Sequence, residues 1–251
     1  MKVSIITICY NSAATIEATI ESVVQQSYSN IEYIIIDGAS KDDTLSIVDR
    51  YKSHISKVVS EKDNGIYDAM NKGVSLASGD IIGILNSDDF YAYPDVLSDI
   101  VKRFQQTHAD ALYADLVYVD RNNAQRIRRY WKAGTYRHGK FLRGWMPPHP
   151  TFFVKKEVYE KYGVYTTDLK SSSDYEFMLR VLHKHKISVT YFPRVITKMR
   201  TGGQSNASVI HRAAANREDK KAWEMNGLKP RAYTILLKPI SKIGQFLRKK
   251  G

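Results

Sequence analysis

Runs of apolar residues alternate, over the first 120 residues, with segments whose apolar positions recur every three or four residues. The nearly continuous apolar run Val3–Cys9 is typical of a buried strand, and Asn11–Gln26 after it has the spacing of a helix. The alternation continues through the segments Ile31–Ile36, Asp42–Tyr51, Lys57–Ser60, Ile66–Ala77, Asp80–Leu85, Tyr93–Gln106 and Ala111–Val119. Strands that alternate with helices predict an α/β fold, with a mostly parallel sheet and helices on both faces.

The pattern becomes less regular after Asp120. The segment Arg121–Pro150 has no clear period, and we predict a loop or an excursion of short strands there. Further strands are predicted at Thr151–Val154, Ile187–Tyr191 and Val195–Met199, and further helices at Lys155–Tyr162 and Ser173–Lys184. We therefore expect one α/β domain over residues 1–210, with a mixed sheet, and an α-helical tail over residues 211–251.

Charge is distributed unevenly along the 251 residues. The net charge of +12 by itself favours nucleic acid or an anionic surface as a partner. Residues 1–120 nevertheless hold 18 acidic and 9 basic side chains, whereas residues 121–147 hold 8 basic and no acidic ones. Because the acidic residues gather where the fold is most regular, we expect no nucleic acid as a partner.

The cysteine content and the lengths of the apolar runs bear on location. The single cysteine, Cys9, cannot form an internal disulfide, and no basic-then-apolar leader precedes the first strand. The longest unbroken apolar runs have 4 residues, whereas a membrane-spanning helix needs roughly 20. We therefore expect a cytoplasmic protein that does not span a membrane.

Acidic residues directly follow three of the predicted strands. They are Asp37, the pair Glu61 and Asp63, and the pair Asp88 and Asp89. Ligands of open parallel sheets bind outside the carboxyl ends of the strands, so these carboxylates are expected at one edge. Mg²⁺ is usually shared between one or two carboxylates and a substrate phosphate, which predicts a site for a cation and a diphosphate. The alternative for each single aspartate is a turn or a helix N-cap.

Four strings of the sequence resemble the family 2 glycosyltransferases, and the resemblance covers roughly residues 1–205. Ser4–Asn11 resembles the first strand and turn, and Ile36–Thr44 resembles the Asp-Asp-Gly-Ser nucleotide-binding turn. Ser60–Gly73 is the most specific string and is similar to members that build bacterial surface polysaccharides. Gly79–Asp89 resembles the strand that carries the Asp-x-Asp metal motif. The family consists of inverting enzymes with the GT-A fold, a Rossmann-like arrangement.

The resemblance implies a nucleotide-sugar donor, most simply a UDP-sugar, and Mg²⁺ or Mn²⁺ as cofactor. It assigns the donor to residues 1–120 and the acceptor to residues 121–210. The positions that it implies for the donor site are Tyr10, Asn11, Asp37, Asp63, Asp68, Asn71, Lys72, Asn86, Ser87 and Asp88. Asp88 keeps the metal-facing position of the motif, and His149 is the second candidate metal ligand.

Ser171–Glu176 lies where the family has a Glu-Asp pair that opens a helix, and Asp174 matches the catalytic base. A carboxylate of ordinary pKa suffices as this base, because the acceptor hydroxyl becomes acidic as its new bond forms. We expect Asp174 to depend on its position more than on a raised pKa. The candidate contacts with the acceptor or the diphosphate are Asp89, His149, Arg200 and Gly203. A rigid turn at His149 and a plain turn at Gly203 are the alternatives.

The tail beyond Lys229 has the pattern of a basic amphipathic helix. Its apolar positions are Leu236, Ile240, Ile243, Phe246 and Leu247, and lysine and arginine residues lie between them. Such a helix is predicted to lie on an anionic membrane surface, although its apolar side can instead pack on the domain. Related enzymes often use lipid-linked acceptors, so the resemblance implies a lipid-linked oligosaccharide acceptor and a peripheral position at the inner face of the cell membrane.

Two other functions stay open at this point. A basic RNA- or DNA-binding protein is favoured by the cluster Arg126, Arg128, Arg129, Tyr130 and Trp131. A catalytically inactive homologue that still binds the donor is favoured by three departures from the motifs. Gly38 and Asn86 each replace an aspartate, and Ser173 replaces a glutamate.

Overall fold

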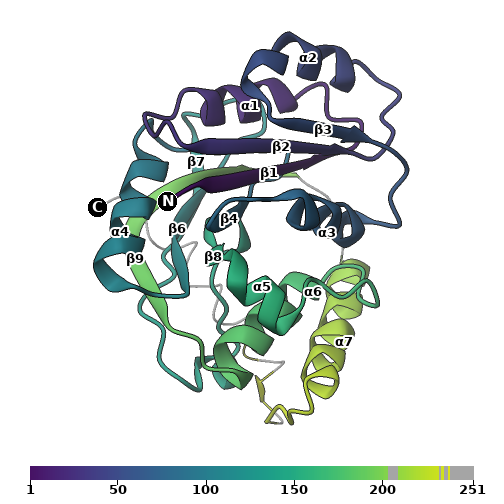
Figure 1. Ribbon diagram of the computed structural model, residues 1–251. Coiled ribbons are helices and arrows are strands. Elements are labelled where there is room, and N and C mark those ends of the chain that lie inside the picture. Colours follow the sequence, from purple (N-terminus) through teal and green to yellow (C-terminus); the bar gives the residue numbers. More distant parts are fainter. Residues whose placement is uncertain (203–208, 232, 235–236, 238–251) are drawn as a thin grey trace.

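A computed structural model describes residues 1–202, 209–231, 233–234 and 237. Its strands are β1 (Val3–Cys9), β2 (Ile31–Asp37), β3 (Lys57–Ser60), β4 (Ile81–Ile84), β5 (Asp89–Tyr91), β6 (Ala111–Val119), β7 (Ile127–Trp131), β8 (Phe153–Lys155) and β9 (Val189–Arg200). They form one nine-stranded sheet in the order β3-β2-β1-β4-β8-β6-β9-β5, with β7 paired to β6 (Figure 1). Strands β3, β2, β1 and β4 are parallel, as are β6 and β9, whereas β8, β5 and β7 are antiparallel to their neighbours. The predicted mixed, mostly parallel sheet is confirmed.

Helices cover both faces of the sheet, as predicted (Figure 1). The helices are α1 (Ile16–Val24), α2 (Thr44–Arg50), α3 (Ile66–Leu76), α4 (Val96–Thr107), α5 (Lys156–Tyr162), α6 (Ser173–Met178) and α7 (Val209–Met225). Apolar residues of α1, α2 and α4 pack in one cluster with Val3 and Ile5 of β1. Those of α3, α5, α6 and α7 pack in a second cluster with Ile6 and Ile8. The two-residue alternation of β1 therefore feeds two hydrophobic cores, one on each face.

Helix α3 lies unusually close to the sheet. A Cβ atom added to Gly73 would lie 2.3 Å from the Cγ2 atom of Ile6 on β1. Only glycine fits such an approach without a shift of the backbone or of the isoleucine. This close packing fixes α3, which carries several of the predicted donor-binding residues, against the strand that begins the donor half.

The structure differs from the predicted elements at three places. Helix α1 begins at Ile16 rather than near Asn11, whose φ of 48° lies in the left-handed region and cannot continue a helix. The short strand β5 was not predicted, because its three residues give too little pattern to detect. The two strands predicted between Ile187 and Met199 form one strand, β9, whose pairing with β6 shifts register near Ala114.

Residues 121–150 contain β7 and two short 3₁₀ turns, Lys140–Arg143 and His149–Thr151, as expected for an excursion of short elements. Helix α7 runs across residue 210, the predicted end of the domain, and packs on α6. The apolar tail positions Leu236, Ile240, Ile243, Phe246 and Leu247 lie outside the described residues, as does Gly203. In the part of the chain that the structure describes, no helix is both long and apolar enough to cross a bilayer.

Candidate active site

The predicted donor segments meet at one edge of the sheet. Cys9 pairs with Asp37, and Asp37 pairs with Ser60, so β1, β2 and β3 end side by side. Strand β4 runs parallel to β1 and ends at Ile84, just before the segment with Asp88. The parallel order of these strands therefore brings segments that are up to 80 residues apart in the sequence to a common edge, as the sequence predicts.

Asp37 holds the turn that follows β2. It is fully buried, and its carboxylate accepts hydrogen bonds from the Ser40 amide at 3.0 Å, from the Ser60 hydroxyl at 2.6 Å and from the Ser40 hydroxyl. Asn11 joins the same turn, because its side chain accepts from the Lys41 amide at 2.9 Å. These bonds fix the shape of the loops at this edge, where the donor is predicted to bind.

Gly38 lies between two of the predicted donor residues. A Cβ atom at this position would lie 3.1 Å from Oδ2 of Asp63 and 3.3 Å from Cδ2 of Tyr10. An aspartate, which the resembled motif has here, would therefore begin in contact with both and place a second carboxylate beside Asp63. The Tyr10 side chain is 58% exposed at this edge, which leaves its ring open to a planar ligand.

Lys72 balances an acidic cluster on α3 and the loop before it. Its ammonium lies 2.7 Å from Asp63, 2.9 Å from Glu61 and 3.6 Å from Asp68. The hydrogen bonds to Asp63 and Glu61 raise the pKa of Lys72 above its usual value. Asp68 also accepts a hydrogen bond from the Asn64 amide at 2.9 Å, at the start of α3.

Asn71 connects α3 to the second half of the chain. Its amide group donates to the Tyr165 carbonyl at 2.8 Å and accepts from the Tyr165 amide at 3.0 Å. Both hydrogen-bonding ends of this side chain are therefore used on the backbone of a loop 94 residues away in the sequence. In the structure Asn71 joins the two halves of the site.

The segment between β4 and β5 holds buried oxygen atoms without partners. Asp89 is fully buried, and the amide of Asn86 donates to its Oδ2 at 3.3 Å. Oδ1 of Asp89 and Oδ1 of Asn86 are both buried and have no hydrogen-bond partner among the described residues. Ser87 shares a 2.8 Å hydrogen bond with Ser12, which ties this segment to the loop after β1.

These oxygens fit a divalent cation. Burial raises the pKa of Asp88, and burial together with the nearby Asp88 carboxylate raises that of Asp89. Such carboxylates are stabilised by a positive charge, and carboxylate and amide oxygens are the ligands that Mg²⁺ and Mn²⁺ prefer. Within the described ranges no group of three or more His, Cys, Asp or Glu side chains is placed to hold a metal. A cation at Asp88 would therefore need oxygens of the substrate to complete its shell.

Arg200 brings positive charge to this segment. Its guanidinium donates to the Asp88 carbonyl at 3.1 Å and lies over the Phe90 ring, 4.7 Å from the centroid. Arg121 donates to the Gly202 carbonyl at 3.5 Å, and both arginines act electrostatically on Asp88. Burial lowers the pKa of Arg200, so its charge lies in a partly dehydrated place. Among the described residues neither arginine forms an ion pair within 4.0 Å.

The predicted base Asp174 lies in the first turn of α6 and contacts α3. The Tyr67 hydroxyl donates to Oδ1 of Asp174 at 3.1 Å across 107 residues of sequence. Burial and the Asp174 charge raise the pKa of Tyr67, which keeps the hydroxyl a donor. The sequence pattern indicates only a core role for Tyr67, and it is indeed buried. Its position in the most specific string was the only signal of a further role.

His149 belongs to the surroundings of Asp174. It is buried and shares a 3.2 Å hydrogen bond with the Tyr165 hydroxyl, which in turn bonds to the Tyr159 hydroxyl at 3.2 Å. Burial lowers the pKa of His149, and the charge of Asp174 opposes this shift. The described contacts of His149 are thus with the base side of the site, and its role as a metal ligand stays a prediction.

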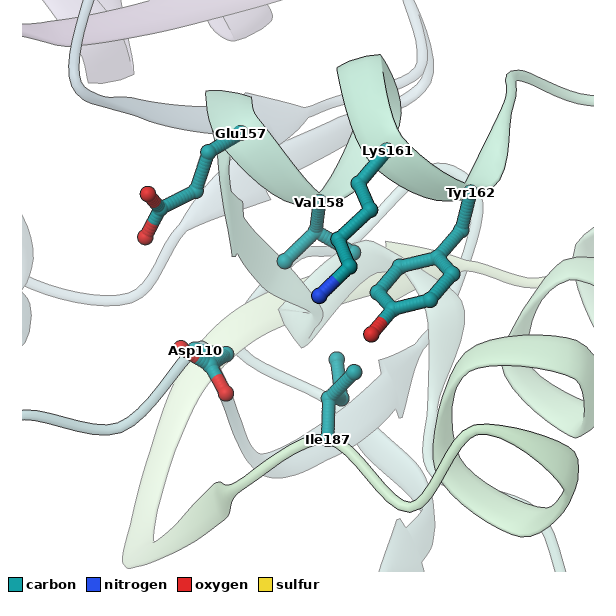
Figure 2. Close-up of a pocket in the computed structure, with 6 residues that line it drawn as sticks. All are labelled: Asp110, Glu157, Val158, Lys161, Tyr162 and Ile187. Carbon is teal, nitrogen blue, oxygen red and sulfur yellow. The ribbon is translucent and has the colours of Figure 1, made fainter.

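A separate cavity lies at the opposite edge of the sheet. Figure 2 shows Lys161 and Tyr162 of α5 reaching over a space of about 240 Å³ toward Ile187 and Asp110. Asp110 and Ile187 precede β6 and β9, so this space adjoins the amino ends of those strands. It is smaller than typical ligand pockets, and no predicted site residue lines it.

Comparison with known proteins identifies the family. A sequence model of glycosyl transferase family 2 matches residues 4–164. An uncharacterized glycosyltransferase of Mycobacterium tuberculosis is 33% identical over 180 residues, which are 71% of this chain and 68% of that protein. The Escherichia coli UDP-Glc:alpha-D-GlcNAc-diphosphoundecaprenol beta-1,3-glucosyltransferase WfaP is 40% identical over 101 residues, 39% of each chain.

The fold has counterparts among solved structures. The mannosyltransferase PcManGT of Pyrobaculum calidifontis, solved in complex with GDP-Man and Mn²⁺, superimposes with a TM-score of 0.68 at 19% identity. The match covers 98% of this chain and 69% of the mannosyltransferase. The mixed sheet and its helices are therefore those of a GT-A, Rossmann-like fold. The chain belongs to glycosyl transferase family 2 and is a glycosyltransferase.

Proposed function

We propose that this enzyme transfers a sugar, with inversion, from a UDP-sugar to a lipid-linked oligosaccharide in the synthesis of a surface polysaccharide. The observation that carries the proposal is that a candidate site for a metal-bound diphosphate and a candidate general base both occur beside the same edge of the sheet. Asp88 lies there beside the buried, unpartnered oxygens of Asn86 and Asp89, and Arg200 contacts its carbonyl. Asp174 lies on the base side, where Tyr67 donates to one of its oxygens. The first suits a metal-bound diphosphate, and the second suits proton removal from an acceptor.

The donor half would receive the nucleotide between the loops that follow β1 and β2. The exposed ring of Tyr10 offers a flat apolar surface for the base. Asp37 and Asn11 hold the loops in place through hydrogen bonds within the protein. Ser87, Asn71 and Asp63 lie on the segments that face this edge.

The leaving group would be stabilised at Asp88. A bound Mg²⁺ or Mn²⁺ supplies positive charge to the diphosphate as the bond to the sugar breaks. Asp88 would hold the cation, and Asn86 and Asp89 offer the adjacent buried oxygens. Arg200 adds a fixed charge that needs no reorganisation during the reaction, because its guanidinium is already held over Phe90.

Asp174 would act as the general base in a single displacement. The acceptor oxygen forms a bond to the anomeric carbon while the bond from that carbon to the diphosphate oxygen breaks. The acceptor proton passes to Asp174, and the nucleoside diphosphate leaves with the electron pair. Because Tyr67 donates to Oδ1, the second carboxylate oxygen of Asp174 is left to accept this proton.

The acceptor and the location are proposed from the name of a relative and from the sequence beyond Lys229. The diphosphoundecaprenol in the name of the Escherichia coli relative supports a lipid-linked acceptor. The basic, amphipathic sequence beyond Lys229 supports contact with an anionic membrane surface. Together they favour a peripheral enzyme at the inner, cytoplasmic face of the cell membrane.

Thermal stability with nucleotide sugars tests the donor site. A ligand that binds only the folded protein raises its melting temperature, so one UDP-sugar with Mn²⁺ should raise it and the same sugar with chelator should not. Asp88→Ala should lose at least about tenfold in metal-dependent donor affinity, since a partly buried charge contact contributes roughly 1.5–3 kcal/mol. The control Asp49→Ala removes an exposed carboxylate that forms an ion pair with Lys52.

The outcomes separate the alternatives. Normal metal-dependent binding by Asp88→Ala would remove Asp88 from the metal site. Donor binding by the wild type without transfer to any lipid-linked acceptor, and without donor hydrolysis, would favour the inactive homologue. Binding to RNA or DNA that weakens steeply with salt, in the absence of any nucleotide-sugar effect, would favour the nucleic-acid-binding protein.

A further inference from the structure

Helix α7 contacts the chain on both sides of Asp174. Before Asp174, α7 binds the backbone at residues 168–171. After Asp174, Trp223 of α7 binds Tyr175, and Asn226, the residue that follows α7, binds Glu176. These contacts come from the part of the chain predicted as a tail, and they lie beyond residue 164, where the family match ends. Figure 1 shows α7 lying next to α6 on the same face of the sheet.

Glu218 makes the contacts before Asp174. Its carboxylate accepts hydrogen bonds from the Lys170 amide at 3.0 Å, from the Ser171 amide at 2.8 Å and from the Ser171 hydroxyl at 2.8 Å. These hydrogen bonds, together with the Ser172 amide, lower the pKa of Glu218 against the opposing effect of burial. Successive backbone amides that point at one carboxylate form a well-defined anion site, here filled by the protein itself.

Trp223 and Asn226 make the contacts after Asp174. The Trp223 indole donates to the Tyr175 hydroxyl at 2.9 Å, and the Asn226 amide donates to Glu176 at 3.0 Å. Glu176 also forms a 2.9 Å ion pair with Arg180, which donates to the Val164 carbonyl at 2.6 Å. Trp223 is 1% exposed, so this end of α7 is part of the core.

The loop before α6 is buried where it enters the helix. Ser172 and Ser173 are buried, and the Ser173 hydroxyl has no hydrogen-bond partner among the described residues. Helix α6 begins at Ser173, directly after this loop, and continues as a π-helical segment over Leu179–Lys184. Because Asp174 is the second residue of α6, its position depends on the loop that enters the helix. The direction of the Asp174 side chain therefore depends on the bonds that hold residues 170–171.

We propose that Glu218 is a positioning residue for the catalytic base: its carboxylate fixes the loop at Lys170 and Ser171 and so aims Asp174 at the acceptor. This inference rests on the proposed function, in which Asp174 is the base. The proposal assigns α7 a role in catalysis, whereas the sequence pattern predicted only a basic helical tail. A small displacement of a catalytic group costs large factors in rate, so the effect should fall on turnover.

The test compares Glu218→Gln with Glu224→Gln on the same helix. Glutamine at 218 keeps the size of the side chain but replaces one acceptor oxygen by an NH₂ group, which faces amide donors. Glu224 is exposed and, among the described residues, forms an ion pair with Lys220 alone, at 3.8 Å. We expect Glu218→Gln to lower kcat about 10- to 100-fold with donor KM and UDP-sugar affinity within twofold of wild type. Glu224→Gln should match wild type in all three.

Amide hydrogen exchange supplies a readout that does not depend on activity. In Glu218→Gln the amides of residues 168–176 should exchange at least several-fold faster, while those of β1 and β2 should not change. An unchanged kcat, or donor affinity that falls as much as kcat, would overturn the proposal. A different outcome is faster exchange in Glu218→Gln together with a wild-type enzyme that transfers no sugar. That outcome would contradict the proposed function, whereas the contact between Glu218 and the loop would still be established.

Discussion

The two halves of the site are built differently. In the donor half, the turn after β2 is held by partners in the same turn and on the adjacent strand ends, such as the Ser40 amide and the Ser60 hydroxyl on Asp37. In the base half, the contacts that hold Asp174 and its loop come from distant parts of the sequence. Tyr67, which donates to Asp174, lies 107 residues before it. Glu218, which accepts from the Ser171 amide, lies 47 residues after Ser171. The proposed donor site is thus built by loops at the ends of adjacent strands, whereas the proposed base site forms only when several helices have packed against one another.

This difference predicts that substitutions can impair donor binding and turnover independently of each other. Residues at the strand ends should control donor binding and metal dependence. Residues around α6 should control turnover while the donor still binds. Each of the following variants tests one side of that division.

The largest effect is expected from Asp174→Asn. Removal of a general base typically costs about 10²- to 10⁴-fold in rate, and asparagine cannot accept the acceptor proton. Transfer measured with a radiolabelled UDP-sugar should fall by that factor. The control Asp168→Asn changes an exposed residue in the same loop, whose backbone carbonyl and not its side chain contacts α7. Turnover retained by Asp174→Asn would remove Asp174 as the base.

A smaller effect is expected from Tyr67→Phe. The variant loses the 3.1 Å hydrogen bond to Asp174 but keeps the ring, which stacks with Tyr165 at 6.0 Å. A hydrogen bond to a charged group contributes roughly 1.5–3 kcal/mol, so kcat should fall at least about tenfold with donor affinity unchanged. Tyr33→Phe is the matched control, since it removes an equally buried hydroxyl that bonds to Thr7. Equal losses in the two variants would argue against a specific role for Tyr67.

The smallest effect is expected from Ala39→Gly, on stability rather than rate. Ala39 has a φ of 61°, in the region that favours glycine, and the resembled motif has glycine at this position. Glycine removes the backbone strain at this position, which stabilises the folded state, but it also gives the unfolded chain more conformational freedom, which opposes that gain. The net increase in the free energy of unfolding should be about 0.5–1 kcal/mol. Ala18→Gly in the interior of α1 should instead destabilise it by about 1 kcal/mol. Urea denaturation measures both, and a loss of stability in Ala39→Gly would contradict the account of this turn.

The same division explains how much could be predicted from the sequence. Strands β1 and β6 begin and end where the apolar runs do, because strands that are buried on both faces need nearly continuous apolar residues. The acidic strand ends were predicted to meet because parallel strands share an edge, and Asp37 and Asp63 do lie on neighbouring loops. Local patterns were enough for this half of the molecule.

The base half was harder to predict for a physical reason. The bond between Tyr67 and Asp174 depends on how α3 packs against α6, and no periodicity encodes that distance. The docking of α7 depends on Trp223, whose burial is visible only in the folded chain. The apolar periodicity of α7 is weak, so the sequence pattern predicts only a helical tail, although residues of this helix make specific contacts with the domain. The resemblance supplied Asp174 but not the residues that hold it.

The most direct test of the central claim is calorimetric titration of Asp174→Asn with the UDP-sugar substrate and Mn²⁺. If the donor and base sites are separate, this variant binds the donor with a Kd within about twofold of wild type while it transfers no sugar. A Kd raised as steeply as transfer is lowered would contradict the account, because Asp174 would then belong to the donor site.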